Sequence, residues 1–302
     1  MISNGGYLFV TFAGEHSGGE QIYFALSRDG LHWEDLNGGH SVLQSCIGEK
    51  GVRDPFLLRS HQGNRFYLLA TDLRIASGTK WDDAVTNGSL SFILWESEDL
   101  LHWTGPRACR IAPDNAGCVW APEAVYDPHK DAFMVFWSSF VKGRHRIYRA
   151  YTKDFHTFSK ADIYLERPYD VIDMTIIRKD EMFFRFYKNE EEKIICMDCG
   201  ERLDGEFCPV ASRQLSQIRG VEGPAAFQLK NGDFCLLIDQ FETGGGYVPL
   251  LSRDLQHGIF SVMEETDYEM GAVCKRHGSV LTLSAEEYQR LAKKYGRSSN
   301  GK

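Results

Sequence analysis

Strongly apolar runs alternate with short polar turns along most of the chain, and four stretches share one layout. Each stretch has a short strand-like run, a polar turn and a longer apolar run. The four stretches cover residues 52–73, 121–140, 171–189 and 221–241. One turn is Asn231-Gly232-Asp233, and Asn-Gly between two apolar runs is a strong hairpin signal. The pattern therefore predicts a β-hairpin in each stretch.

A second pattern lies between these hairpins. A Ser or Thr is followed two residues later by Asp, and an aromatic residue follows a few positions further on. The hydroxyl and the carboxylate can accept hydrogen bonds from turn amides, while the aromatic ring covers a hydrophobic layer. The clear copies are Ser27–Asp29 before Trp33, Ser97–Asp99 before Trp103, Thr152–Asp154 before Phe158 and Ser252–Asp254 before Phe260, and Cys199 to Phe207 is a degenerate copy.

Hairpin-rich units that recur roughly every 50 to 60 residues are typical of a β-propeller. The spacing predicts an all-β, five-bladed propeller that forms a single domain over residues 1–302. The fifth blade is split: residues 277–283 supply its inner strand, and residues 7–12, residues 21–27 and the Trp33 segment supply its outer strands. Closure by both ends of the chain removes an open sheet edge.

Two segments fall outside the repeats. The first interval is longer by about 15 residues, and the excess lies in Arg74 to Ser89, where we expect a long polar loop that shapes a binding face. Ser284 to Glu287 form a capping box that predicts a short C-terminal helix over residues 284–296, which Gly296 ends. We expect residues 297–302 to be a disordered tail.

Composition narrows the class of protein. The 302 residues are 43% hydrophobic, which excludes intrinsic disorder. The 42 acidic residues exceed the 34 basic residues, which argues against nucleic-acid or anionic-membrane partners. No apolar run approaches the roughly 20 residues of a membrane span. Residues 1–6 lack a basic start and a signal-cleavage site, and the 8 cysteines show no paired metal spacing, so we expect a cytoplasmic protein with reduced thiols.

Acidic residues stand near the start of the first strand in each stretch: Asp54, Glu123, Asp173 and Glu222. If these strands are innermost, their starts converge on the propeller axis. Carboxyl groups that share a pocket shift each other's pKa values apart, which acid–base catalysis exploits. Asp-Pro and Glu-Gly-Pro are also ordinary turn sequences. Their recurrence favours Asp54, Asp173 and Glu222 as a catalytic set, whereas Glu123 has either a substrate-binding or a structural role.

These residues carry a resemblance that covers nearly the whole chain. Val52-Arg53-Asp54-Pro55, Val119-Trp120-Ala121-Pro122, Ile172-Asp173 and Val221-Glu222-Gly223-Pro224 together resemble glycoside hydrolase family 43. The resemblance implies a five-bladed propeller that inverts anomeric configuration, commonly on α-L-arabinofuranosides and β-D-xylosides.

The resemblance also implies the role of each carboxyl group. Asp54 is the expected general base, Glu222 the general acid, and Asp173 the residue that tunes and holds the acid. Arg276-His277-Gly278 is similar to the family's axial histidine region, where His277 can bind a structural calcium or sodium ion, although no cofactor is required. Asp173 lacks the proline that often follows it, and strands precede Asp54, so the subfamily stays open.

A sugar substrate also needs aromatic platforms and hydrogen-bonding side chains. Arg185 lies within the apolar run 182–187, where a charge is explained only by an axial pocket or a buried carboxylate. Blade packing explains Trp137 as well as a sugar contact does. Besides Glu123, the candidate substrate-binding residues are Arg53, Asp72, Trp120, Trp137, Arg185, Lys188, Arg276 and His277.

The predicted function is inverting hydrolysis that releases terminal α-L-arabinofuranosyl or β-D-xylosyl residues from plant-type oligosaccharides. Three alternatives stay open. An invertase-like retaining enzyme would need an Asn-Asp-Pro motif, which the first 53 residues lack. A sialidase-like enzyme would need a longer Ser-x-Asp box and three arginines, and a non-catalytic sugar-binding propeller would not need the carboxylates. The exact sugar, the exo or endo mode and the oligomeric state are not determined by the sequence.

Overall fold

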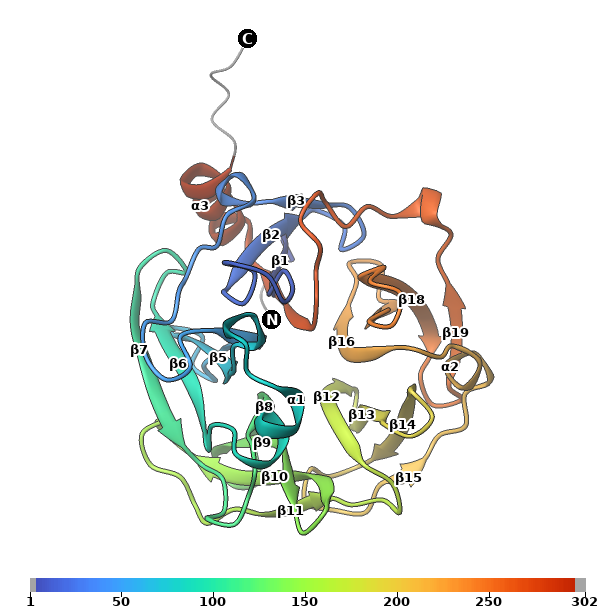
Figure 1. Ribbon diagram of the computed structural model, residues 1–302. Coiled ribbons are helices and arrows are strands. Elements are labelled where there is room, and N and C mark those ends of the chain that lie inside the picture. The colour runs from blue at the N-terminus through green and yellow to red at the C-terminus, as the bar shows by residue number, and fades with distance from the viewer. Residues whose placement is uncertain (1–3, 297–302) are drawn as a thin grey trace.

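Five four-stranded antiparallel sheets surround one axis in the computed structural model, which describes residues 4–296 (Figure 1). The five-bladed propeller is therefore confirmed. Blade 1 is β4 (Val52–Arg59), β5 (Phe66–Asp72), β6 (Ser91–Ser97) and β7 (Trp103–Arg110); blade 2 is β8 (Trp120–Asp127), β9 (Ala132–Val141), β10 (Arg144–Thr152) and β11 (Asp162–Leu165). Blade 3 is β12 (Val171–Lys179), β13 (Met182–Asn189), β14 (Ile194–Gly200) and β15 (Cys208–Pro209); blade 4 is β16 (Glu222–Gln228), β17 (Phe234–Asp239), β18 (Tyr247–Asp254) and β19 (Ile259–Val262).

Blade 5 joins the two ends of the chain, as predicted. Its order is β20 (Gly278–Leu283), β1 (Gly6–Thr11), β2 (Tyr23–Ser27) and β3 (Trp33–Asp35). β20 pairs with β1 along its whole length, from Leu283 opposite Gly6 to Gly278 opposite Thr11. Helix α3 (Ala285–Tyr295) follows and has the predicted capping box between Ser284 and Glu287. The predicted disordered tail, residues 297–302, lies outside the described residues.

One hydrophobic cluster fills each space between neighbouring blades. Side chains alternate between the two faces of a strand, so each blade contributes one set of apolar residues to each neighbour. Leu68 and Ile93 of blade 1, for example, pack with Leu8 and Phe24 of blade 5. On the other face of the same blade, Leu69 packs against blade 2. The propeller therefore has layered cores and an axial region bordered by polar strand ends.

The repeated outer turns adopt the predicted hydrogen-bond pattern. Ser27 Oγ accepts from Gly30 N at 2.8 Å, and Asp29 Oδ1 accepts from Leu31 N at 2.8 Å. The Ser97–Asp99 and Thr152–Asp154 turns repeat these contacts. The Ser-x-Asp pattern therefore stabilises the outer turns.

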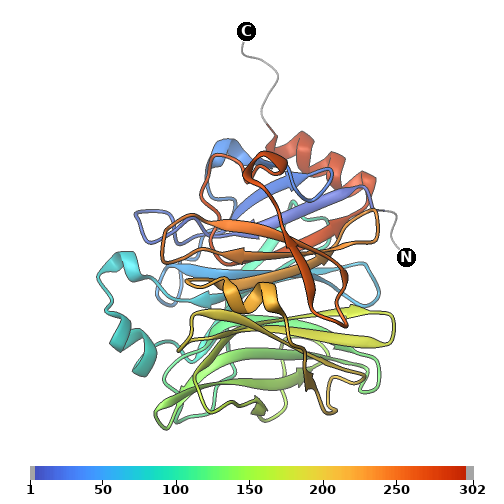
Figure 2. The ribbon, with the colours of Figure 1, turned by 90° about the vertical axis from the view of Figure 1, so that its right-hand side faces the viewer.

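Two further short helices correct the prediction of a single helix. They are α1 (Trp81–Thr86) and α2 (Arg213–Gln217), and they are accompanied by 3₁₀ turns at Asn37–Gly39, Ile75–Ser77 and Glu265–Asp267. Helices of five or six residues are too short to show an amphipathic period. Helix α1 occupies the predicted excess 74–89 and projects from one face of the propeller (Figure 2). Within residues 4–296, none of the helices has the length and apolar character needed to span a bilayer.

Candidate active site

The inner strands of blades 1 to 4 share one backbone irregularity. Each shifts register against its neighbour near its start, between Arg53 and Phe56 in β4 and at the equivalent positions of β8, β12 and β16. The residue in the bulge has a left-handed backbone, with φ of 48° at Asp54, 47° at Ala121, 53° at Asp173 and 53° at Gly223. Such bulges re-aim side chains. For residues other than Gly this conformation is uncommon, and it clusters at functional sites.

The bulge shows that the four acidic residues are not equivalent, which corrects the sequence-based alignment. Asp54 and Asp173 occupy the bulge itself. Glu222 precedes the bulge residue Gly223 by one position, whereas Glu123 follows Ala121 by two. The extra residue of a bulge changes which face a side chain takes. Glu222 therefore faces a pocket, while Glu123 is buried in the interior.

His277 lies between the two bulge carboxylates. Its Nδ1 is 3.5 Å from Asp54 Oδ1 and 3.7 Å from Asp173 Oδ2. Gly223 N donates to Asp173 Oδ2 at 3.1 Å, so Asp173 is joined to the residue after Glu222. A Cβ on Gly223 would lie 2.7 Å from the His277 ring, so this position requires glycine. Residues of blades 1, 3 and 4 thus meet at the axis.

The fixed orientation of Asp54 has a second source. Thr71, on the neighbouring strand β5, donates through Oγ1 to Asp54 Oδ2 at 2.7 Å, and the same hydroxyl accepts from Ala121 N at 2.8 Å. Asp173 N likewise donates to Ser138 Oγ of blade 2 at 3.2 Å. The bulge amides turn away from their own sheets and bond to the preceding blade, which fixes the carboxylates relative to one another.

Two cations hold Glu222 from opposite sides. Lys188 Nζ donates to Glu222 Oε2 at 2.9 Å, and Arg276 Nη2 donates to Oε1 at 3.2 Å. Each cation also contacts a second carboxylate, since Lys188 lies 2.7 Å from Glu190 and Arg276 lies 2.7 Å from Asp239. Positive and negative charges alternate along this row of five side chains. The row extends the candidate site beyond the residues expected from the sequence, to Glu190 and Asp239.

The pKa values of Asp173 and Glu222 differ, and their order is the reverse of the expected one. Burial raises the pKa of Asp173 to about 6, and the Glu222 charge adds to this, although His277 opposes it. Burial also acts to raise the pKa of Glu222, but Lys188 and Arg276 outweigh it and the net pKa is lowered. We expected Asp173 to keep Glu222 protonated. In the ligand-free site the two cations reverse that order, so Asp173 is the weaker acid.

A cavity of about 680 Å³ opens over this cluster. Five predicted residues line it: Arg53, Trp120, Lys188, Glu222 and Arg276. Asp54, Asp173 and His277 lie directly behind this lining, and their side chains are 13%, 9% and 6% exposed. The pocket therefore has carboxyl groups at its floor, where small exposures leave room for a bound sugar or a water molecule but little bulk solvent.

An aromatic wall borders the same pocket and includes residues that the sequence analysis missed. Trp81 of α1 packs edge-on against Trp120 with ring centroids 6.0 Å apart, and Trp120 stacks on His145 at 5.1 Å. Phe241 lies below Lys188 at 4.0 Å. Trp81 is 45% exposed, which marks it as a contact surface at the pocket mouth. Its position in the 74–89 insertion was the signal that could have identified it.

The sequence of this chain matches a known protein family. A family of probable glycosyl hydrolase domains, related to glycoside hydrolase family 43, matches residues 3–289. The chain belongs to this family. The predicted relation to family 43 glycosyl hydrolases is thereby confirmed. An α-L-arabinofuranosidase of Bifidobacterium longum subsp. longum is 33% identical over 210 residues, which cover 62% of this chain but only 20% of that protein.

Solved structures share the fold of this family 43-related domain. A family 43 β-1,3-galactosidase with galactodeoxynojirimycin has a TM-score of 0.61 at 11% identity, covering 87% of this chain and 91% of that chain. An endo-1,4-β-xylanase of Bacteroides thetaiotaomicron has a TM-score of 0.58 at 12% identity, covering 92% and 99%. At these identities the likeness shows the propeller alone.

Two predicted substrate-binding residues of the family 43-related domain have structural contacts instead. Asp72 is buried and accepts from Glu49 N at 2.8 Å, so it anchors the loop before β4. Arg185 pairs with the buried Asp198 at 2.6 Å and lies over the Phe207 ring. A buried carboxylate was one of the two explanations for this arginine, and it is the one observed. Neither side chain lines the pocket.

Trp137 and Glu123 also lie away from the pocket. Trp137 is 1% exposed within the core between blades 1 and 2, and its Nε1 donates to Ser139 Oγ at 3.0 Å. Packing therefore accounts for it. Glu123 is 3% exposed, and burial raises the pKa of its carboxyl well above the usual value. This buried carboxyl beside Thr175 does not line the pocket.

The predicted ion site is centred on His277. Nδ1 of His277 faces two carboxylates, but residues 4–296 contain no group of three or more His, Cys, Asp or Glu side chains arranged around a common metal position. The side chains therefore do not form a ligand set. Calcium or sodium binding stays a prediction.

Replacement of Asp173 by Asn should stabilise the domain at neutral pH. The folded-state pKa of Asp173 is raised from 3.8 to about 6, so its stabilising effect is fully present below pH 4 and is lost as the pH rises through about 6. We expect Asp173→Asn to raise the melting temperature by about 2–6 °C at pH 7.5 and to have little effect at pH 4. Thermal denaturation across this pH range measures the difference, and a pH-independent difference would contradict the shift.

Proposed function

We propose that this domain is an inverting glycoside hydrolase that removes terminal α-L-arabinofuranosyl or β-D-xylosyl residues from oligosaccharides. The observation that carries the proposal is the meeting of Asp54, Asp173 and Glu222, from three blades, at the floor of one pocket. The arabinofuranosidase name of the Bifidobacterium relative supports the choice of sugar. Family membership supports the class of reaction.

Asp54 is the proposed general base. Thr71 and His277 hold its carboxylate in one orientation, and its 13% exposure leaves space for a water molecule on the pocket side. An inverting reaction needs this water on the face of the sugar ring opposite the leaving oxygen. The two carboxyl groups then stand ~6.5–9.5 Å apart, a separation that residues on blades 1 and 4 can provide across the axis.

Glu222 is the proposed general acid, and Asp173 is the group that supplies its proton. Glu222 lines the pocket, whereas Asp173 lies behind it and retains a proton up to about pH 6. The two carboxyls are electrostatically linked, so they bind their first proton as a pair. A sugar that separates Glu222 from Lys188 or Arg276 removes the interaction that lowers the Glu222 pKa. The proton then moves to the residue that faces the leaving oxygen.

The shape of the pocket favours removal of terminal residues. Glu222 lines the pocket with Asp54 directly behind the lining, and Trp81 stands at the mouth with 45% of its surface exposed. A sugar on the floor therefore leaves the rest of the oligosaccharide beside Trp81. Aromatic rings bind the apolar faces of sugar rings through such exposed surfaces, which makes the wall a site for the leaving group.

Replacement of Glu222 and Asp54 should separate the roles of acid and base. Glu222→Gln should lower kcat/KM for an arabinosyl oligosaccharide by about 10³-fold, yet by less than about 10-fold for a 2,4-dinitrophenyl arabinofuranoside, whose leaving group needs no proton. Asp54→Asn should lower both rates by about 10²–10⁴-fold. Steady-state kinetics with the two substrates and the matching xylosides measures these effects.

Asp72→Asn is the matched control, since Asp72 is a buried carboxyl at the end of a blade 1 strand but outside the pocket. Its rates should stay within about threefold of the wild type. Undiminished activity of Glu222→Gln on the oligosaccharide would refute the acid assignment. Lack of activity on all arabinosides and xylosides would favour a sugar-binding propeller.

Removal of the Trp81 ring should weaken the binding of only those substrates whose leaving group is long enough to reach it. Trp81→Ala should raise KM for arabinosyl oligosaccharides about 3–10-fold and leave methyl arabinofuranoside unaffected, because one aromatic contact contributes ~0.5–1.5 kcal/mol. Ile163→Ala is the control, since Ile163 is 46% exposed on the outer strand of blade 2. Equal changes in KM for both substrates would contradict a role in leaving-group binding.

A further inference from the structure

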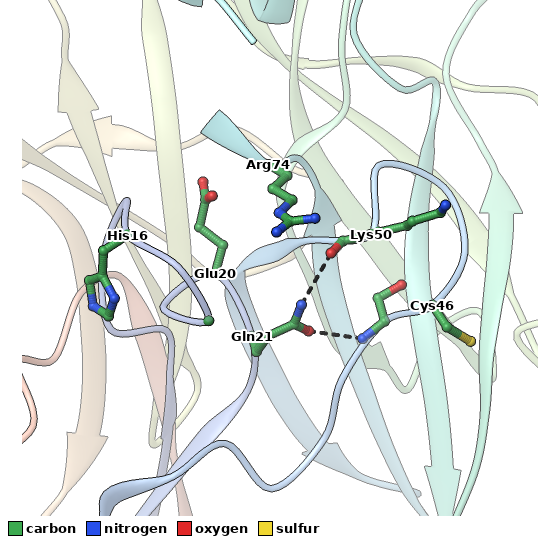
Figure 3. A pocket seen from close by; sticks show the side chains of 8 residues that line it. His16, Glu20, Gln21, Cys46, Lys50 and Arg74 are labelled. Atoms are coloured by element: carbon green, nitrogen blue, oxygen red, sulfur yellow. Dashed lines mark hydrogen bonds between the residues drawn. The ribbon is translucent and has the colours of Figure 1, made fainter. Parts of the chain in front are cut away.

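A second cavity, which we call the side pocket, adjoins the active-site pocket and has a volume of about 390 Å³ (Figure 3). Its lining includes Glu20, Gln21, Ser45, Cys46, Lys50 and Arg74. These residues come from the loops after β1 and before β4 and from the start of the 74–89 insertion. Arg53 lines the active-site pocket and pairs with Glu20 at 3.2 Å, so this ion pair forms a wall shared by the two pockets.

The side pocket is held in shape by bonds that do not depend on a ligand. Gln21 Nε2 donates to Lys50 O at 3.1 Å, and Gln21 Oε1 accepts from Ser45 N at 2.9 Å, as the dashed lines in Figure 3 show. The loop from Ser45 to Lys50 is thus folded around one amide side chain. A Cβ on Gly51 would lie 2.5 Å from Arg74 Cβ, so glycine at this position lets the arginine pack closely.

Arg74 is the chemically unusual member of the lining. It is partly buried, yet its guanidinium makes no ion pair or hydrogen bond with any residue of the described chain, 4–296. In Figure 3 its guanidinium points into the pocket between Glu20 and Gln21. The chain has 42 acidic and 34 basic residues, so carboxylate partners are in excess. A guanidinium that faces a pocket and has no partner within the described chain is available to an anionic group of a ligand.

Glu20 does not neutralise Arg74. Its carboxylate already accepts from Ile75 N and Ala76 N, both at 2.8 Å, and pairs with Arg53. Gln21 and Ser45 are also engaged, since Ser45 Oγ donates to Ile47 O at 3.0 Å. The polar side chains that remain are those of His16, Lys50 and Arg74. Among them, the planar guanidinium of Arg74 is the group that matches a carboxylate.

We propose that the side pocket binds a hexuronic acid unit of the same oligosaccharide whose terminal sugar occupies the active-site pocket. This inference rests on the proposed function. Arg74 forms a charge-assisted pair with the uronate carboxylate, and Lys50, exposed at the rim, adds a second positive charge. Because the pockets share the Arg53–Glu20 wall, the two sugars belong to neighbouring parts of one substrate. The domain therefore acts preferentially on acidic oligosaccharides.

The test compares arabinosyl xylo-oligosaccharides with and without a glucuronic acid substituent. The wild type should show about a tenfold higher kcat/KM for the acidic substrate, since a charge-assisted bond contributes at least this factor. In Arg74→Gln this ratio should fall to about 1, and in Arg74→Lys it should be partly retained. Arg213→Ala, at an exposed arginine of α2, is the control and should retain the wild-type ratio. A ratio near 1 in the wild type, or an unchanged ratio in Arg74→Gln, would overturn the proposal.

A binding measurement separates this inference from the proposed function. Calorimetry with the inactive Glu222→Gln variant should show tighter binding of the acidic oligosaccharide than of the neutral one, and loss of the difference when Arg74→Gln is added. If this pattern appears but the wild type hydrolyses neither substrate, the side pocket stands and the proposed function fails. Competition by inorganic sulfate as strong as competition by free glucuronate would overturn the sugar assignment.

Discussion

Like charges are concentrated near the propeller axis, and their mutual repulsion is the constraint on which the rest of the site depends. Two carboxylates 4 Å apart repel by about 4 kcal/mol at an effective dielectric constant of 20. Asp54 and Asp173 are arranged around His277, and Glu222 is held by Lys188 and Arg276. Without these cationic or polar partners the folded chain would have to keep several acids protonated. In the fold, Glu222 is instead ionised, and Asp173 holds its proton more tightly than Glu222 does.

The backbone makes this arrangement possible. Left-handed bulge residues recur at the start of the inner strands of blades 1 to 4, and the amides of Ala121, Asp173 and Gly223 bond to the preceding blade. The bulge directs Asp54 and Asp173 toward the axis, while closure by β20 brings His277, the residue before this strand, into contact with both carboxylates. Catalytic geometry and blade-to-blade packing therefore share the same hydrogen bonds. Local strain at these two aspartates is compatible with a stable domain because five hydrophobic layers support it.

Much of the architecture could be predicted because it repeats. Hairpin turns, outer Ser/Thr-x-Asp turns and the split fifth blade follow from patterns within neighbouring residues. The register of the acids could not be predicted, because a bulge inserts one residue without a signal in side-chain alternation, and so Glu123 was grouped with Glu222. Arg185 and Asp72 bond to Asp198 and to the backbone of Glu49, and these partners are fixed only by strand pairing and loop closure. Helix α1 was missed because its few residues show no periodicity, yet it supplies Trp81.

The direction of the pKa split is the finding that most changes the chemical interpretation. Sequence reasoning placed a proton on Glu222 because Asp173 is nearby, but it could not show that Lys188 and Arg276 both contact Glu222. In the proposed mechanism, proton delivery is coupled to substrate binding, because the bound sugar weakens those contacts. This coupling would favour reaction only when a sugar fills the pocket.

In the proposed reaction, water activated by Asp54 displaces a leaving group protonated by Glu222 in a single step. Proton NMR of the first sugar released from an α-L-arabinofuranoside tests it most directly, because one displacement inverts the anomeric centre. A single displacement gives β-L-arabinofuranose as the first product, before mutarotation. First appearance of the α anomer would show two displacements and would contradict the assignment of Asp54 as a base.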